Sequence, residues 1–235
     1  MNDSGMNGFI HGSGKPLRIG HRGAAGHAPE NTLASLELAI ALGVDLVEFD
    51  VRRTADRALV LLHDRAVDRT TNGQGPVETL PVQVLCGLDA GGGERIPLLK
   101  EALACLNRRA GAMIELKVEG MAADVCAIVK ASGFQGLVIY ASFFHEELLT
   151  VKSLMANALT LALIEKAPDH PTAFATNAQA THAGLALKIV TPDLVAAIRE
   201  KAIKVFIYTV DEPDDIARMK SLGVDGIISN FPDRI

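Results

Sequence analysis

The sequence predicts an α/β fold, and within that class a (β/α)₈ TIM barrel with a small insertion after the second strand. Eight short apolar segments have the character of strands, and each except the last is followed by a segment with a helical pattern. The chain has 235 residues, which is close to the roughly 250 typical of this barrel. A long open sheet would also hold eight parallel strands, but the short and similar strand lengths favour a closed barrel.

The first strand, helix and strand set the pattern. Residues 17–21 form the first expected strand, and Asn31 or Thr32 can cap the helix that follows. Gly43 ends that helix, and residues 44–51 form the second strand. Strands joined through a helix by short connections are typical of a parallel βαβ unit.

The chain then leaves this pattern before resuming it. Residues 52–64 predict a turn followed by a strand at 58–62, which delivers His63. Residues 65–96 contain turn-forming residues and three consecutive glycines without a clear period, so we expect an irregular insertion that caps one end of the sheet. The organisation is therefore a flexible lead-in at residues 1–16 and a single barrel domain at residues 17–235.

After the insertion the alternation of helices and strands continues to the end of the chain. We expect helices at residues 97–109, 121–131, 145–155, 172–180, 192–201 and 213–221. The intervening strands are expected at residues 112–117, 137–141, 160–165, 184–187, 204–210 and 224–229. The patterns of the helix at 172–180 and the strand at 184–187 are the weakest of these.

The composition limits the class of protein and its partners. A formal net charge of −5 gives no basic surface for nucleic acid or an anionic membrane. No apolar run approaches the roughly 18 residues of a membrane span, and the N-terminus has no secretory signal pattern. Cys86, Cys105 and Cys126 lie far apart, so we expect buried free thiols. These features predict a cytoplasmic protein.

Polar residues follow the predicted strands at the end of the barrel where active sites form. Glu48 and Asp50 are two positions apart on one strand, so they face the same way, with Leu46 one layer deeper and the residues between them facing the helices. Two carboxylates directed into a barrel repel each other unless a cation joins them. The alternative is a solvated edge with salt bridges to Arg52 or Arg53.

Glu115 and Lys117 repeat this spacing on the next strand. Three carboxylates from adjacent strand ends form an all-oxygen site that suits Mg²⁺ or Ca²⁺. Zinc is less favoured because no paired histidines or cysteines accompany the carboxylates. Lys117 and Arg22 beside such an ion suggest a phosphate group, although either could instead neutralise a carboxylate in a structural ion pair.

Two histidines lie at the same end of the predicted barrel. His21 ends the first strand and His63 ends the excursion, and neutral-range pKa values suit one to accept a proton and the other to donate one. His27 could line the pocket or only complete its loop. The remaining histidines are expected at the surface, namely His11, His145, His170 and His182.

Taken together, these residues resemble the glycerophosphodiester phosphodiesterase family. The motifs that carry the resemblance are HRG at 21–23, PENT at 29–32, EFDV at 48–51, HD at 63–64, DRTT at 68–71, IP at 96–97, IELK at 114–117 and DGIISNFPD at 225–233. They span nearly the whole chain from Leu17 onward. Each motif alone is weak, but the combination is specific.

The resemblance implies a (β/α)₈ barrel that hydrolyses small phosphodiesters, such as glycerophosphocholine or glycerophosphoethanolamine, to sn-glycerol 3-phosphate and an alcohol. The nucleophile could be water or the glycerol hydroxyl of the substrate, the latter giving a cyclic phosphate. The implied roles are metal ligands for Glu48, Asp50 and Glu115, acid and base for His21 and His63, phosphate contacts for Arg22 and Lys117, and loop support for Glu30.

The sequence also departs from the family pattern. Asp56 and Arg57 stand where the family has Asp-Gly, and Tyr208 and Asp211 stand where Trp and Asn are common. The match is also poor around Lys188, so the wall that faces the glycerol or alcohol is expected to differ. A metal-dependent barrel aldolase or sugar isomerase, and a non-catalytic phosphate-binding barrel, are the alternative functions.

Overall fold

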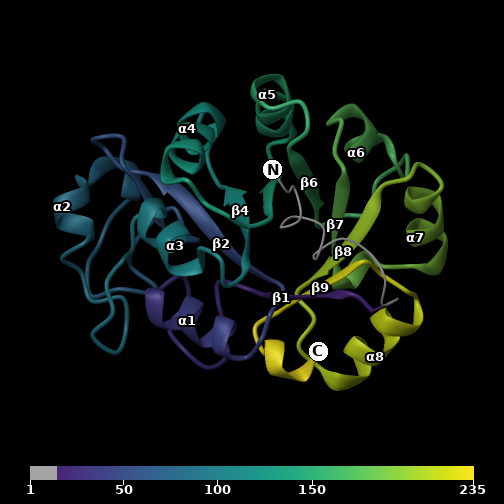
Figure 1. The fold of residues 1–235 in the computed structure, drawn as a ribbon, viewed down its shortest axis with the longest axis horizontal. Coiled ribbons are helices and arrows are strands. Elements are labelled where there is room, and N and C mark those ends of the chain that lie inside the picture. Colours follow the sequence, from purple (N-terminus) through teal and green to yellow (C-terminus); the bar gives the residue numbers. More distant parts are fainter. Residues whose placement is uncertain (1–14) are drawn as a thin grey trace, which may run out of the picture.

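Eight parallel strands close into a barrel in the computed structural model, which describes residues 15–235. The barrel strands are β1 (Leu17–Gly20), β2 (Leu46–Arg53), β4 (Gly111–Leu116), β5 (Val138–Ser142), β6 (Leu159–Ile164), β7 (His182–Ala186), β8 (Lys204–Tyr208) and β9 (Gly226–Ser229). β1 pairs with both β9 and β2, which closes the barrel, and the purple and yellow ends of the chain therefore lie side by side (Figure 1). The predicted fold class is confirmed.

The helices form a ring around these strands (Figure 1). They are α1 (Leu33–Ala41), α3 (Leu99–Leu106), α4 (Ala122–Ser132), α5 (His145–Leu154), α6 (Ala173–Asn177), α7 (Pro192–Arg199) and α8 (Pro213–Ser221). Every barrel strand and every surrounding helix that the sequence predicts is present, and the observed ends differ from the predicted ends by a few residues. Within residues 15–235, none of the helices has the length and apolar character needed to cross a membrane.

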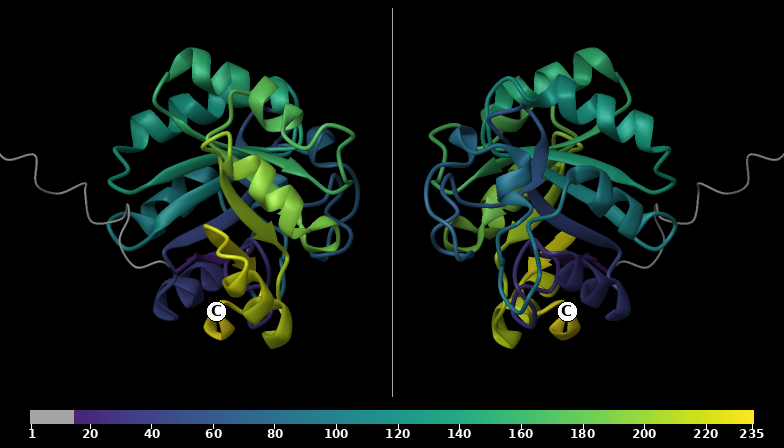
Figure 2. Two further views of the ribbon diagram at one scale, coloured as in Figure 1. Left: turned by 90° about the vertical axis from the view of Figure 1, so that its right-hand side faces the viewer. Right: turned by 90° about the vertical axis from the view of Figure 1, so that its left-hand side faces the viewer.

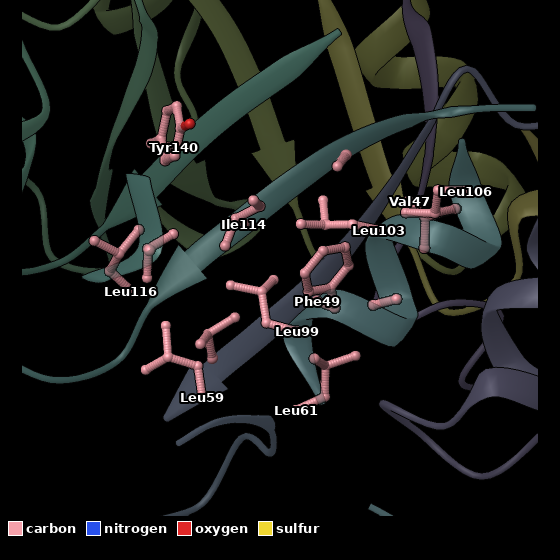
Figure 3. Close-up of a cluster of buried hydrophobic side chains, with 14 of the residues drawn as sticks. Val47, Phe49, Leu59, Leu61, Leu99, Leu103, Leu106, Ile114, Leu116 and Tyr140 are labelled. Atoms are coloured by element: carbon pink, nitrogen blue, oxygen red, sulfur yellow. The ribbon is translucent and has the colours of Figure 1, made fainter. Parts of the chain in front are cut away.

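The side chains of β2 alternate between the barrel interior and the helix layer, as the sequence predicts. Leu46 belongs to the apolar cluster inside the barrel, below Glu48. Val47 and Phe49 belong to the cluster between the strands and the helices. Figure 3 shows the Phe49 ring among leucines of β3 and α3. One strand thus anchors the barrel to its helices and carries carboxylates toward the mouth.

The hairpin and the insertion follow β2. β3 (Leu59–Leu61) pairs antiparallel with β2, and its turn places the non-glycine Arg57 at φ 65°. The next segment contains the short 3₁₀ helix η1 (Val77–Thr79) and the short helix α2 (Val82–Leu85), which share a small apolar cluster with Val60 of β3. This segment lies on one flank of the molecule, which faces the viewer in the right-hand view of Figure 2.

Two expectations about burial need correction. His182, expected at the surface, lies in β7 with only 4% of its surface exposed, and its ring meets the edge of Phe206. His145 is half-buried with Nε2 3.0 Å from the carbonyl oxygen of Leu163, whereas His170 is exposed as expected and His11 lies outside the described residues. The burial of a histidine depends on the apolar residues around it in the strand or helix more than on the residue type.

The three cysteines are free, as expected, but only Cys126 is buried. Cys86 and Cys105 are half-buried, so the expectation of buried thiols is wrong for these two. Cys86 follows the short helix α2 of the insertion, and Cys105 lies on α3 with its thiol 3.3 Å from Glu37 Oε1.

Candidate active site

The carboxyl ends of three neighbouring strands bring the predicted site residues together. His21 and Arg22 directly follow β1, Glu48 and Asp50 lie on β2, and Glu115 lies on β4. Asp50 and Glu115 are register partners in the parallel pairing of β2 with β4. The site therefore forms at the C-terminal mouth of the barrel, which is where such barrels carry their chemistry.

Three carboxylates form a buried cluster there. One oxygen from each of Glu48, Asp50 and Glu115 lies within 4.8 Å of the other two, and the residues are only 4%, 1% and 9% exposed. Burial, reinforced by repulsion from Asp50, raises the pKa of Glu48 well above its usual value and that of Glu115 to about 7. The cluster is therefore not a solvated edge.

The cluster fits a hard divalent cation. All of its donor atoms are carboxylate oxygens, which Mg²⁺ and Ca²⁺ prefer. In addition, Glu48 Oε1 and Asp50 Oδ1 are buried and have no hydrogen-bond partner. A buried anionic oxygen without a partner is costly, and a cation between these side chains would remove that cost. Glu48, Asp50 and Glu115 are therefore a possible metal site.

Two basic side chains border the carboxylates. Lys117 Nζ donates to Glu115 Oε1 at 2.7 Å and lies 3.4 Å from Asp50 Oδ1. Arg22 donates its backbone N–H to Glu48 Oε2 at 2.8 Å, and its Nε lies 3.4 Å from Asp50 Oδ2. Although burial alone would raise the pKa of Asp50, Lys117 and Arg22 hold it below its usual value. Both cations thus make ion pairs with the carboxylates at the mouth.

The loop between β1 and α1 is shaped around this cluster. Asn31 donates to Asp50 Oδ2 at 2.9 Å and accepts from the Asp50 backbone N–H at 3.1 Å, whereas Thr32 caps α1. Gly23 has φ +89°, and a Cβ there would lie 2.3 Å from Ser35 Oγ. Asn31 is thus a support of Asp50 that sequence reasoning treated only as a possible helix cap.

His21 is oriented by a chain of side-chain hydrogen bonds. Its Nδ1 lies 2.7 Å from Asn230 Oδ1, and Asn230 Nδ2 donates to Asp211 Oδ2 at 2.7 Å. Because a carboxylate only accepts, the amide oxygen of Asn230 must face His21, so Nδ1 carries the proton and Nε2 holds a lone pair. That Nε2 lies 4.0 Å from Glu48 Oε2. Burial and the Arg22 charge lower the pKa of His21 to about 4.

His63 is held by a carboxylate network. Its Nδ1 lies 2.7 Å from Asp64 Oδ1, and Arg69 donates to Asp64 Oδ2 at 2.6 Å. Arg69 also donates to both oxygens of Glu30, and Glu30 accepts from Arg22 at 2.8 Å. Burial lowers the pKa of His63, with Asp64 opposing this effect. The network ties the two histidine-bearing loops together, and it includes two residues, Asp64 and Arg69, to which sequence reasoning gave no role.

The other residues singled out from the sequence lie around the cluster or away from it. Tyr208 lines the small hollow beside His21 and donates its hydroxyl to the Ile164 carbonyl at 2.8 Å. Asp211 stands behind Asn230 and does not line that hollow. His27 pairs with Asp233 at 2.7 Å and has a structural role at the C-terminus. Lys188 is exposed and lies 4.0 Å from Glu165.

Comparisons with known proteins match one family over nearly the whole chain. Residues 21–234 match the model of the Glycerophosphoryl diester phosphodiesterase family. A Glycerophosphodiester phosphodiesterase of Caldanaerobacter subterraneus subsp. tengcongensis is 34% identical over 94% of this chain and 96% of its own. A Glycerophosphodiester phosphodiesterase of Bacillus subtilis is 32% identical over 92% of this chain and 84% of its own.

Solved structures are similar over nearly the whole chain as well. A phosphodiesterase from Oleispira antarctica, in complex with the product sn-glycerol-3-phosphate, has a TM-score of 0.87 and 28% identity and covers 94% of this chain and 95% of its own. A glycerophosphodiester phosphodiesterase from Agrobacterium tumefaciens has a TM-score of 0.82 and 31% identity over 93% and 98% of the two chains.

Proposed function

Because the chain belongs to the glycerophosphodiester phosphodiesterase family and is thus a phosphoric diester hydrolase, we propose that it hydrolyses glycerophosphodiesters to sn-glycerol 3-phosphate and an alcohol at the mouth of its barrel. The observation that carries the proposal is the position of His21, Arg22 and Lys117 around the buried carboxylates, with His63 close enough to interact electrostatically with Asp50. A phosphodiester needs positive charge near its oxygens and groups that move protons on either side.

Glu48, Asp50 and Glu115 would hold one divalent cation, Mg²⁺ or Ca²⁺. When bound, such an ion supplies neutralisation of the phosphate oxygens, where charge is held in the transition state. Arg22 and Lys117 bind the same phosphate from the protein side, and their ion pairs with Asp50 keep them directed toward it.

The two histidines divide the proton transfers. His21 presents the lone pair of Nε2, so it accepts the proton of the attacking hydroxyl, which is either water or the free hydroxyl of the glycerol. His63, hydrogen-bonded through Nδ1 to Asp64, donates a proton to the departing alkoxide. Attack by the glycerol hydroxyl would release the alcohol first and leave a cyclic phosphate, which water then opens.

The test is release of glycerol 3-phosphate from glycerophosphoethanolamine and glycerophosphocholine, followed with Mg²⁺, Ca²⁺ or EDTA. We expect cation-dependent turnover that falls by at least about 10²-fold in His21→Ala and His63→Ala, the scale of general acid–base catalysis. His170→Ala, which changes an exposed histidine, is the matched control and should leave turnover unchanged. Undiminished turnover in both site variants would remove these histidines from the chemistry.

A substrate with a leaving group of low pKa separates the two roles. A glycerophosphodiester of p-nitrophenol needs little protonation of its leaving group, so it should rescue His63→Ala much more than His21→Ala. Equal rescue of both variants would contradict the assignment while leaving the hydrolysis itself intact. Phosphorus NMR during turnover would detect a cyclic phosphate if the glycerol hydroxyl attacks.

A further inference from the structure

A basic cleft adjoins the mouth of the barrel, and apart from Lys117 its residues have no part in the mechanism above. It has a volume of about 580 Å³ and lies between the β2–β3 hairpin, the first part of the insertion and the connection after β4. Five cationic side chains line this arginine cleft, namely Arg52, Arg53, Arg57, Arg65 and Lys117, against two acidic ones. The cleft is thus locally basic, although the net charge of the chain is −5.

The arginine cleft is continuous with the catalytic residues. Lys117 lines the cleft and also donates to Glu115 at 2.7 Å. Arg52 Nε donates to the carbonyl oxygen of His63 at 2.9 Å. By contrast, the hollow beside His21 inside the mouth has a volume of only about 20 Å³, which is too small for the alcohol part of a substrate. A group attached to the phosphate therefore has to extend outward from the mouth.

Most of the cations in the arginine cleft are already paired. Arg65 pairs with Glu78, while Arg57 and Arg53 lie 2.9 and 3.6 Å from Asp124. Arg52 is the exception, because no carboxylate of residues 15–235 lies within the 4.0 Å of an ion pair from it. Arg52 is thus the cation of the arginine cleft that has no direct carboxylate partner among residues 15–235.

The hollow on the other side of the mouth has no lining cation that lacks a carboxylate partner among residues 15–235. It has a similar volume of about 560 Å³ and lies beyond Tyr208. Its cations are both paired, since Lys188 lies 4.0 Å from Glu165 and Arg218 lies 2.8 Å from Asp215. Of these two hollows, as residues 15–235 form them, the arginine cleft alone offers a substrate anion a cation without a carboxylate partner.

We propose that the arginine cleft receives the alcohol part of the substrate and that Arg52 forms an ion pair with an anionic substituent on it. The enzyme then prefers glycerophosphodiesters whose alcohol carries a carboxylate or phosphate over those with only an ammonium group. This inference rests on the proposed function and adds the substrate class. The five-donor fork of a guanidinium matches a carboxylate or phosphate, whereas it repels an ammonium.

The test uses two substrates that differ by a single group. Glycerophosphoserine and glycerophosphoethanolamine are identical except for the carboxylate of serine. We expect kcat/KM to be about tenfold or more higher for the serine compound, which corresponds to about 1.4 kcal/mol of differential binding. In Arg52→Gln the ratio should fall toward one, through a higher KM for the serine compound. Arg52→Lys, which keeps the charge, should retain part of the ratio.

Lys188→Gln is the matched control, because it removes a cation from the hollow on the other side of Tyr208 and should leave the ratio unchanged. A ratio that is the same in Arg52→Gln and in the wild type, or a wild-type preference for ethanolamine, would overturn the inference while glycerol 3-phosphate release still supports the proposed function. Absence of glycerol 3-phosphate from both compounds would instead refute the proposed function, and this inference with it.

Discussion

Asn230 decides how His21 presents its ring to the substrate. The Asn230 amide is held between Asp211 and His21, and this fixes which imidazole nitrogen carries the proton. Among residues 15–235, neither Asn230 nor Asp211 makes a hydrogen bond to Glu48, Asp50 or Glu115, so they act through His21 as positioning residues. Their effect should therefore appear in turnover more than in stability.

Replacement of Asn230 tests this chain of hydrogen bonds. In Asn230→Ala we expect kcat to fall by about 10- to 100-fold, the usual cost of losing a group that orients a functional histidine. The hydrogen bond to Asn230 raises the pKa of His21, so its loss should also shift the acidic limb of the pH–rate profile to lower pH. Asp211→Asn keeps an acceptor for Asn230 and should lose much less. An unchanged profile in Asn230→Ala would contradict the positioning role.

His182 predicts a pH dependence of stability that is independent of the active site. Burial lowers its pKa from 6.5 to about 4 in the folded chain. Between these two pKa values the unfolded chain therefore binds more protons than the folded chain. The contribution of neutral His182 to the free energy of unfolding is fully present above about pH 6.5 and is lost as the pH falls toward 4. At pH 5 the loss is about 2 kcal/mol.

Urea unfolding at pH 7 and pH 5 measures this effect. The wild type should lose more stability between the two pH values than His182→Gln, by about 2 kcal/mol. His170→Gln changes an exposed histidine and should behave as the wild type. An identical loss of stability in the wild type and in His182→Gln would show that the buried histidine does not titrate as described.

The sequence predicted those site residues whose direction follows from the alternation of side chains along a strand. Glu48 and Asp50 had to share a face of β2, and Glu115 follows from the same spacing on β4. Asn31, Arg69 and Asn230 were not assigned these roles, because each role depends on a hydrogen bond to a residue far away in the chain. Asp64 was not assigned either, although its partners His63 and Arg69 are close in the chain. The motifs PENT, HD, DRTT and DGIISNFPD contain these residues, and their match to the family pattern was the signal available in the sequence.

At the scale of elements, β2 is the strand that joins the site to the core. Glu48 and Asp50 face the mouth, while Phe49 between them is fully buried against the helix layer (Figure 3). Packing of Phe49 against α3 therefore fixes the height and rotation of the strand on which two of the three carboxylates lie.

Phe49→Ala should destabilise the fold by about 3–5 kcal/mol, because it removes a buried ring and leaves a cavity. The measurement is urea unfolding in the absence of divalent cations, with Phe49→Leu as the milder companion. The exposed Phe144, 40% accessible, provides the control, since Phe144→Ala should change the stability little. A loss below about 1 kcal/mol in Phe49→Ala would contradict the central place of this ring.

The strand with the weakest sequence pattern shows why the ends of an element are harder to predict than the fold. β7 begins at His182, two residues before the expected start at Gly184. A Cβ at Gly184 would lie 2.6 Å from Leu163 and 2.7 Å from Leu161, so glycine is needed where these leucines fill the barrel. Glycine weakens the strand pattern in the sequence, yet it is the close packing of neighbouring strands that requires it.

At the scale of the whole molecule, the barrel encloses three carboxylates that repel one another. Binding of a divalent cation to the folded chain alone should stabilise it, by about 2.7 kcal/mol at one hundred times the dissociation constant. Thermal unfolding in Mg²⁺ or Ca²⁺ against EDTA should therefore show a higher Tm with the cation. In Glu48→Gln this difference should shrink, while the cation-free variant should be no less stable than the cation-free wild type because one repelling charge is gone.

A single titration can test whether the cation held by Glu48, Asp50 and Glu115 is required for hydrolysis. Protein stripped with EDTA and freed of chelator is titrated with Mg²⁺ or Ca²⁺ while cation binding and glycerol 3-phosphate release from glycerophosphoethanolamine are both followed. We expect one cation per chain, with turnover rising in step with occupancy, and neither signal in Glu48→Gln at the same concentrations. Full turnover by the stripped wild type without any bound cation, or a cation that binds equally well to Glu48→Gln, would contradict this expectation.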